Sequence, residues 1–239
     1  MGLSHSPHIV TDGLVLCLDA ANRRSYPGTG TTWYDLSGNG NHGTLTNGPV
    51  FNGGVEGMSF DGVDDYAEIP SSSDFQFGNG TSDSPFSVSF WVKQNGFFSG
   101  DFIGRHDSTA TQRLWRIILA GSAGQFLFVL YGNNVTNRIQ SEVLSVTIDD
   151  GDWHHVVCTY DGTSSSAGLN IYFDNVKPSQ TKSSAGTYVA MDNFSFPIWI
   201  ARVTTLYSQF RADNIHIYNR ALSANEVQQN YNATRWRFQ

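Results

Sequence analysis

Apolar and polar residues alternate along much of this chain, which is the pattern of β-strands with one buried face. The clearest run is residues 85–93, and its apolar side consists of Phe86, Val88, Phe90 and Val92. We place this strand at the centre of a sheet. Further strands are predicted over residues 9–19, 101–106, 113–120, 125–131, 152–161, 168–175, 195–202 and 209–218. The strand at 152–161 is expected to pair with the one at 168–175.

Residues 57–70 predict a strand, a tight acidic turn and a second strand. Met58 and Phe60 alternate with a serine on the way in, and the outgoing residues alternate as well. The Asp-Gly pair at 61–62 favours a turn, because Gly takes positive φ freely and Asp bonds its own backbone. We therefore predict a hairpin whose tip carries Asp61, Asp64 and Asp65.

The remaining segments are less regular. Residues 20–49 predict a long loop that Trp33, Tyr34 and Leu36 would pin to the domain. A single helix is predicted over residues 222–231, where Ser223 as N-cap and Glu226 three residues later form a capping box.

The pattern as a whole predicts one all-β domain, a two-sheet antiparallel sandwich with one short C-terminal helix. The domain is expected to span residues 9–233, between an N-terminal arm at 1–8 and a C-terminal tail at 234–239.

Composition and charge narrow the function. The 239 residues include 24 Gly and 16 Phe, with 15% charged residues, as expected for strands and loops. A net charge of −7 without a basic block argues against nucleic-acid binding. No apolar run approaches the roughly 20 residues that span a bilayer, and the N-terminus does not resemble a secretory signal. Cys17 and Cys158 fall in predicted strands, so we expect buried free thiols.

Four motifs identify a fold family. They are FDGVDDY at 60–66, FSVSFWVK at 86–93, WHHVVCTYDG at 153–162 and DNIHIYNRALS at 213–223. In this order they resemble the LamG/pentraxin-like family of concanavalin A-type jelly rolls. The resemblance covers residues 9–233 and implies a two-sheet jelly roll.

A narrower resemblance lies at the two ends of the chain. The segments at 12–28, 33–41 and 230–235 are similar to jelly-roll proteins of tailed bacteriophages. This similarity implies a virion structural or decoration protein, made in the host cytoplasm and placed on the capsid, neck or tail surface. Its partners would be other virion proteins and further copies of itself.

The sequence gives little evidence for a glycosidase active site or a zinc site. Glycosidases need two carboxylates about 5–9.5 Å apart, and no acidic pair sits two residues apart on an inward strand face. His154 and Cys158 share a strand face but lie roughly 13 Å apart, too far to ligate one zinc ion. We therefore expect a protein that is not an enzyme, with a Ca²⁺-dependent lectin as the alternative and a glycosidase as the least favoured one.

The acidic residues leave two interpretations open. Ca²⁺ takes six to eight oxygen ligands, and the resembling family often carries a structural or ligand-bridging Ca²⁺. The candidates are Asp61, Asp64, Asp65 and Asp213, with Asp12 and Asp19 at the two ends of a strand expected beside the last one. In the second interpretation, Asp61 and Asp64 are turn residues that bond their own backbones.

Two further groups of residues are candidates for binding. Binding of a surface glycan needs exposed aromatic rings and planar polar groups. The residues that could supply them are Trp33, Tyr34, Arg105, Tyr131, Asn133, Asn134 and Tyr207. The tail holds Arg235, Trp236, Arg237 and Phe238, residue types that are enriched in interfaces. The tail would therefore contact a partner protein, or else dock on its own domain.

Overall fold

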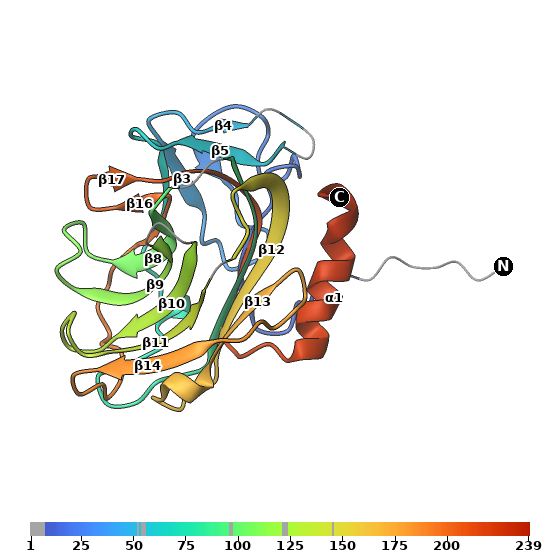
Figure 1. Ribbon diagram of the computed structural model, residues 1–239. Coiled ribbons are helices and arrows are strands. Elements are labelled where there is room, and N and C mark those ends of the chain that lie inside the picture. The colour runs from blue at the N-terminus through green and yellow to red at the C-terminus, as the bar shows by residue number, and fades with distance from the viewer. Residues whose placement is uncertain (1–7, 52, 54–55, 96–97, 121–123, 145) are drawn as a thin grey trace.

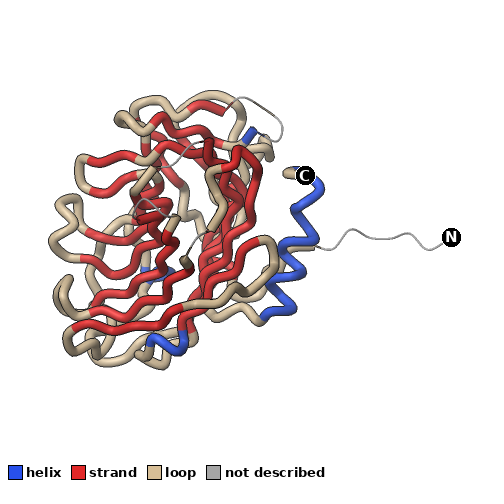
Figure 2. Tube along the Cα trace, viewed as in Figure 1, coloured by secondary structure: helices blue, strands red, loops and turns tan. Residues whose placement is uncertain are grey.

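The computed structural model describes residues 8–51, 53, 56–95, 98–120, 124–144 and 146–239. The predicted arm at 1–8 lies outside the described residues except for His8. Two large antiparallel sheets pack face to face, and helix α1 (Ala224–Thr234) covers the outer side of one of them (Figure 1). Strands dominate the trace in Figure 2. The predicted all-β sandwich with a short C-terminal helix is confirmed.

The seven-stranded sheet has the order β13-β12-β7-β18-β5-β4, and β1 also pairs with β18. Its strands are β1 (Leu14–Leu18), β4 (Val50–Phe51), β5 (Met58–Asp61), β7 (Phe86–Asn95), β12 (Asp150–Tyr160), β13 (Leu169–Phe173) and β18 (Gln209–Tyr218). The central place predicted for the strand at 85–93 and the pairing predicted between 152–161 and 168–175 are both confirmed.

The nine-stranded sheet has the order β14-β11-β10-β9-β8-β15-β6-β3-β2. Its strands are β2 (Thr32–Trp33), β3 (Gly43–Thr46), β6 (Tyr66–Ile69), β8 (Gly100–His106), β9 (Arg113–Ala120), β10 (Gln125–Tyr131), β11 (Arg138–Val143), β14 (Thr181–Ala185) and β15 (Ile198–Ile200). A small separate hairpin consists of β16 (Arg202–Val203) and β17 (Leu206–Tyr207). Short 3₁₀ turns are η2 (Ser73–Phe75), η3 (Ser166–Gly168) and η4 (Arg235–Arg237).

The core fills the space between the two sheets. Alternate residues of β7 point into it, as predicted, and Phe86, Val88 and Phe90 are almost fully buried there. Trp91 points to the opposite side of the same strand, where it packs under the C-terminal segment against Phe238. The period of two along this strand therefore separates the core from a second apolar layer under the helix.

The predicted hairpin at 57–70 is wrong. β5 pairs with β4 and β18 in the seven-stranded sheet, whereas β6 pairs with β3 and β15 in the nine-stranded sheet. Residues 62–65 therefore form an arch that carries the chain from one sheet to the other. Alternation and an Asp-Gly turn are common to hairpins and arches, so neither pattern could identify the partner strands.

The predicted loop at 20–49 also contains the short strands β2 and β3, with Trp33 fully buried. The predicted helix is confirmed, including its capping box between Ser223 and Glu226. It continues to Thr234 and into η4, so the segment predicted as a tail is part of the folded domain. Among the described residues, no helix is long and apolar enough to cross a bilayer. Both cysteines are buried and free, as expected.

Candidate functional site

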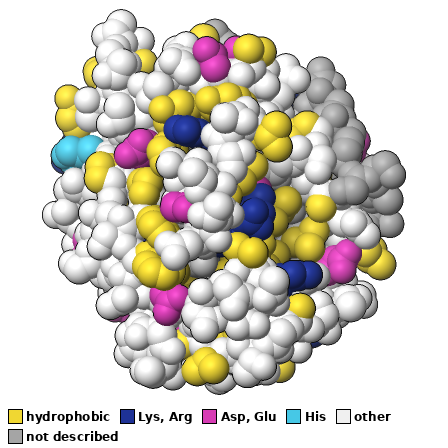
Figure 3. Space-filling view, turned by 90° about the vertical axis from the view of Figure 1, so that its left-hand side faces the viewer, with side chains coloured by type: hydrophobic (Ala, Val, Ile, Leu, Met, Phe, Trp, Pro, Cys, Tyr) yellow, Lys and Arg dark blue, Asp and Glu magenta, His cyan; other side chains and the backbone are white. Residues whose placement is uncertain are grey.

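The outer face of the nine-stranded sheet carries a line of aromatic and charged side chains, which we call the cross-sheet strip. Its members are Tyr207, Tyr66, Arg202, Trp199, His106, Asp101, Arg116, Tyr131, Arg113 and Arg138. Their sequence neighbours, such as Ile198 and Ile200 around Trp199, point into the core. Figure 3 views the molecule from this side and shows basic and acidic side chains set among apolar ones.

One end of the strip is an aromatic clamp around Arg202. The guanidinium carbon of Arg202 lies 4.5 Å from the ring centre of Tyr66 and 4.4 Å from that of Trp199. Tyr207 stacks on the outer side of Tyr66, with ring centres 6.1 Å apart. Arg202 Nε donates to the carbonyl oxygen of Thr204. Stacking and this hydrogen bond hold the guanidinium flat, with donors left for a ligand.

The centre of the strip is a buried ion pair. Arg116 Nε donates to Asp101 Oδ2 over 2.6 Å, and Arg116 Nη2 donates to Asp101 Oδ1. His106 Nε2 lies 3.9 Å from the same carboxylate and has no hydrogen-bond partner. Burial lowers the pKa of His106, which keeps the imidazole neutral. The Asp101 carboxylate is therefore paired with Arg116, and the His106 imidazole is buried beside this ion pair.

A glycine keeps this centre shallow. A Cβ on Gly104 would lie 3.1 Å from Arg116 Cγ and 3.3 Å from Asp101 Oδ2. Any larger residue at this position would push into the ion pair and cover it.

The other end of the strip is basic. The guanidinium carbon of Arg113 lies 5.5 Å from the ring centre of Tyr131, and Arg138 is the cross-strand partner of Tyr131. Asn133 and Asn134 are exposed on the turn that follows Tyr131. None of the ion pairs found among the described residues involves Arg113, Arg138 or Arg202. Three cationic groups thus face outward without a carboxylate partner, on a chain with net charge −7.

The structure corrects several predicted ligand-binding residues. Trp33 is fully buried, and Arg105 is 1% exposed and donates to the carbonyl oxygens of Phe194 and Phe196. Burial lowers the pKa of Arg105 to about 10. The expectation that these two side chains face a ligand is wrong, because both hold the interior together. Tyr34 is 42% exposed and packs on His42, which is not a member of the strip.

Tyr131, Asn133 and Asn134 are brought together at the basic end of the strip, although only 5% of Tyr131 is exposed. Sequence reasoning missed Arg202, Trp199, Arg113, Arg116 and Arg138. One signal for Trp199 was present, since it alternates with Ile198 and Ile200 in a short apolar run. The arginines carry no such signal, because their gathering depends on which strands become neighbours.

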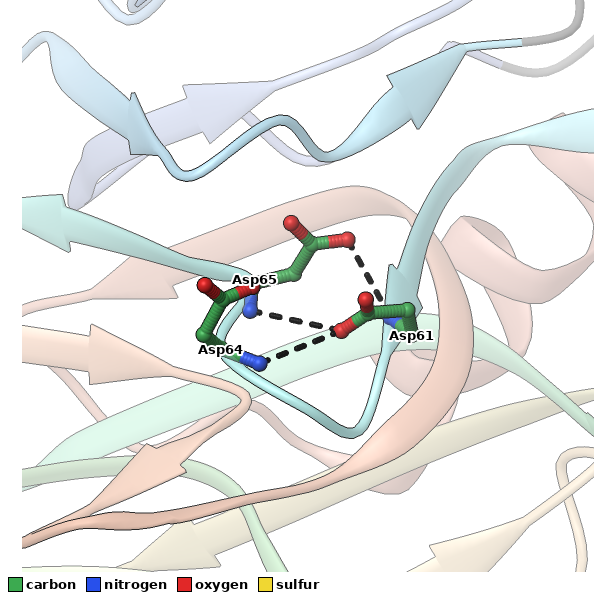
Figure 4. A group of neighbouring side chains, drawn as sticks. All are labelled: Asp61, Asp64 and Asp65. Carbon is green, nitrogen blue, oxygen red and sulfur yellow. Dashed lines mark hydrogen bonds between the residues drawn. The ribbon is translucent and has the colours of Figure 1, made fainter.

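The acidic arch forms a compact cluster (Figure 4). One ligand oxygen of each of Asp61, Asp64 and Asp65 lies within 4.8 Å of the others. Asp61 Oδ1 accepts from the backbone N–H groups of Val63, Asp64 and Asp65, and Asp65 Oδ2 accepts from that of Asp61. The hydrogen bond from Val63 is the largest cause that lowers the pKa of Asp61, whereas burial raises that of Asp65. The turn-residue interpretation is therefore confirmed for Asp61, and the remaining oxygens could still take a cation.

The candidate Ca²⁺ ligands of the arch and those of the terminal strands do not meet at one site. Asp61 pairs with Gln209 at the start of β18, and Asp213 lies four residues further along, roughly 13 Å away. Asp213 and Asp19 do share a cation, but it is Arg237. Arg237 Nη2 lies 2.9 Å from Asp19 Oδ1 and 3.2 Å from Asp213 Oδ2. Burial, followed by the charge of Asp19, raises the pKa of Asp213 to about 7.

The four predicted partner-contact residues divide into two kinds. Arg237 and Phe238 point into the domain, and Phe238 is 7% exposed between Trp91 and Trp153. Arg235 and Trp236 point outward, and Trp236 is 68% exposed. The C-terminal segment docks on its own domain, the alternative that the sequence left open.

Comparison with known proteins identifies one family and several solved structures with a similar fold. The family model described as the concanavalin A-like lectin/glucanases superfamily matches residues 61–228. No curated protein sequence matches the chain.

Solved structures share the fold at low sequence identity. The binding domain of Paraclostridial Mosquitocidal Protein 1 is 18% identical with a TM-score of 0.66, over 92% of this chain and 52% of that one. A botulinum neurotoxin type C structure, described as dependent on two ganglioside molecules for cell entry, is 14% identical with a TM-score of 0.63, over 93% and 52%. A Trypanosoma rangeli sialidase mutant with trans-sialidase activity is 17% identical with a TM-score of 0.66, over 95% and 34%. The chain thus spans about half of each toxin structure and a third of the sialidase.

Proposed function

Because the chain belongs to the concanavalin A-like lectin/glucanases superfamily, we propose that it is a non-catalytic module that binds a glycan on the cross-sheet strip. The clamped Arg202 is the observation that carries the proposal. Its guanidinium lies over the adjoining rings of Tyr66 and Trp199 and keeps donors free for hydroxyl or carboxylate oxygens of a sugar. The basic end of the strip repeats the arrangement with Arg113 on Tyr131, so one extended glycan could reach both ends.

The carboxylates of the strip support a binding role over hydrolysis. A glycosidase needs one carboxyl group that is protonated as an acid and a second that acts as base or nucleophile. Asp101 is the one carboxylate among the residues of the strip, and it is fully buried and paired with Arg116, so the strip does not present two accessible carboxyl groups. The proposal therefore assigns no bond-breaking step to this face.

A glycan array with the purified chain tests the proposal, followed by titration calorimetry with the best ligand. Arg202→Ala is expected to weaken binding about tenfold or more, the equivalent of one charge-assisted hydrogen bond. Arg202→Lys keeps the charge but loses the flat stacked shape, so a similar loss is expected. Arg24→Ala is the matched control, because Arg24 is an exposed arginine outside the strip.

Three results would contradict the proposed glycan-binding function or its location. Binding that is equally strong in Arg202→Ala and Arg24→Ala would place the glycan elsewhere on the molecule. A blank array, with and without EDTA, would remove the binding function altogether. Release of reducing ends from any bound polysaccharide would overturn the non-catalytic assignment.

A second proposal is that the module serves on the surface of a tailed-phage particle, alone or as a homo-oligomer. It is supported by the similarity of segments 12–28, 33–41 and 230–235 to phage jelly-roll proteins, and by the exposed Trp236 beside Arg235. Glycan binding and this location are compatible. Cryo-electron microscopy of purified particles would show the sandwich on the capsid, neck or tail, and particles without it would refute this location.

A further inference from the structure

A groove of about 370 Å³ lies on the opposite side of the sandwich, between the end of α1 and strand β1. Its lining includes Asp19, Arg237, Asn214, His216, Cys17 and Trp236. The volume falls within the range of about 300–1,000 Å³ typical of small-molecule sites. Nothing in the cross-sheet strip contributes to it.

Two buried side chains in this lining have polar atoms without partners. His216 is 2% exposed, and neither of its ring nitrogens makes a hydrogen bond with the described residues. Asn214 is 5% exposed, and its Nδ2 likewise lacks a partner within the described structure. Buried polar atoms are normally satisfied, and each exception costs about 1–3 kcal/mol. These atoms are therefore candidates for contact with a guest molecule.

The backbone explains how Asn214 reaches this position. Strand β18 is irregular between Asp213 and His216, and Asn214 has a φ of 48°. A bulge of this kind re-aims a side chain out of the regular alternation of a strand. Ala212 before the bulge and Ile215 and Ile217 after it point into the core. Asn214 and His216, two residues apart, therefore share the outer face and line the groove together.

The charges of the groove select against ions. Asp19 and Asp213 repel an anion, and Arg237 already occupies the place of a cation between them. Burial raises the pKa of Cys17 to about 12 and lowers that of His216 to about 4, so the groove offers a thiol and a neutral imidazole at pH 7. A neutral imidazole has one donor and one acceptor, and the amide of Asn214 adds donors. Neighbouring hydroxyl groups match this set, because each both donates and accepts.

The rim supplies the apolar contact that a sugar ring needs. Trp236 is 68% exposed, and its Nε1 donates to the carbonyl oxygen of Ala233. This bond orients the indole while its ring face stays accessible to a ligand.

We propose that the groove is a second sugar site, separate from the cross-sheet strip, that holds one uncharged hexose unit. Asn214 and His216 hydrogen-bond its hydroxyl groups, and Trp236 covers a face of its ring. With the strip on the other side, one molecule would have two binding faces and could cross-link glycans. The groove does not depend on the function proposed for the strip.

Nuclear magnetic resonance of the histidine ring nitrogens tests the site, with glucose, galactose and mannose as probes. At least one hexose is expected to shift the His216 nitrogens in a saturable manner and to leave those of His155 unchanged. His155 is the internal control, because it is equally buried and has an unpartnered Nδ1 but does not line the groove. Shifts at neither histidine, or equal shifts at both, would overturn the proposal and leave water as the partner of these atoms.

Variants separate the two sites. Trp236→Ala and Asn214→Gly should each weaken the effect on His216 about tenfold, and glycine keeps the positive φ of this position. Tyr34→Ala is the matched control, an exposed aromatic outside the groove. Arg202→Ala should weaken binding at the strip and leave the response of His216 intact. A response lost in Arg202→Ala but kept in Trp236→Ala would refute the second site.

Discussion

Arg237 donates a hydrogen bond over 3.2 Å to Asp213, a carboxylate with no exposed surface. Asp213 also accepts from the backbone N–H groups of Ala20 and Asn214. One arginine from the end of the chain therefore neutralises a buried acid in the last strand and ties it to Asp19 in the loop after the first. The C-terminal segment closes the sandwich at the point where its two terminal strands meet.

Arg237→Ala is expected to lower the free energy of unfolding by about 3 kcal/mol well above pH 7, because Asp213 would then have to stay charged in the interior without its cation. Below pH 7 the loss should be smaller, since the pKa of Asp213 is raised to about 7 and protonation removes the charge. Urea unfolding at two pH values measures both effects. Arg235→Ala, an exposed neighbour, should change stability by less than about 0.5 kcal/mol. An equal loss in both variants would contradict the ion-pair argument.

The free energy of unfolding is expected to fall as the pH drops below about 6.5. Burial lowers the pKa of His155 to about 3 and that of His216 to about 4 from 6.5. Within this window the unfolded chain binds protons that the folded chain does not, which costs about 1.4 kcal/mol per histidine and pH unit. Asp213 has the opposite effect, because its pKa is about 7 in the folded chain and 3.8 in the unfolded one. Between these pH values the folded chain binds a proton that the unfolded chain does not, and this gain in stability offsets the loss from one histidine.

His154 determines how the stability of the domain changes above neutral pH. The hydrogen bond between His154 and Asp174 is the largest cause that raises the pKa of His154 to about 9. The contribution of His154 to the free energy of unfolding is therefore complete below pH 6.5 and is lost as the pH rises through 9. The stability curve should therefore have its maximum near neutrality. His216→Gln should flatten the acid limb, and an acid slope identical to that of the parent chain would contradict the assignment.

Phe238→Ala is expected to destabilise the domain by about 3 kcal/mol, the usual cost of removing a buried phenylalanine. The ring packs 4.5 Å from the centre of Trp91 and 4.9 Å from that of Trp153, so its loss leaves a cavity under the end of the chain. Thermal and urea unfolding measure the effect. Trp236→Ala is the control, and its exposed indole should contribute less than about 0.5 kcal/mol. A larger loss in Trp236→Ala would mean that the outward residue, and not Phe238, anchors the segment.

Alternation of period two was sufficient to predict the strands that build the core. β7, β8, β9 and β10 begin and end within about two residues of their predicted limits, because their inward residues are large and apolar. β11 and β14 were missed, since edge and near-edge strands such as β14 carry mostly polar residues. β5 and β6 were wrongly predicted as partners. Local alternation shows which side chains of a strand share a face, but it contains no information on which sheet the strand joins.

The candidate site was only partly predictable for a related reason. Tyr131, Asn133 and Asn134 follow one another in the sequence, so their common location is local. Arg202 meets Tyr66 because β15 joins β6 to β8, a pairing that spans about half of the chain. Arg105 illustrates the opposite error, since a polar residue in a strand was expected at the surface and is held inside by carbonyl oxygens.

The acidic arch allows a final prediction about Ca²⁺. Asp61 already fixes the turn through three backbone N–H groups, so the arch has its form without an ion. Asp61→Ala should therefore destabilise the domain by about 1 kcal/mol in EDTA, as the loss of a cap does elsewhere. The unused carboxylate oxygens are too few for tight Ca²⁺ binding, so we expect dissociation constants of about 1 mM or weaker and little change in melting temperature.

Differential scanning fluorimetry with Ca²⁺ and with EDTA measures this directly. Asp64→Asn is the matched control, because it removes one exposed charge and leaves the hydrogen bonds accepted by Asp61 in place. A melting temperature that falls by several degrees in EDTA, and no longer responds in Asp64→Asn, would show that the arch holds a structural cation. The stability of the arch would then come from an ion as well as from its own backbone.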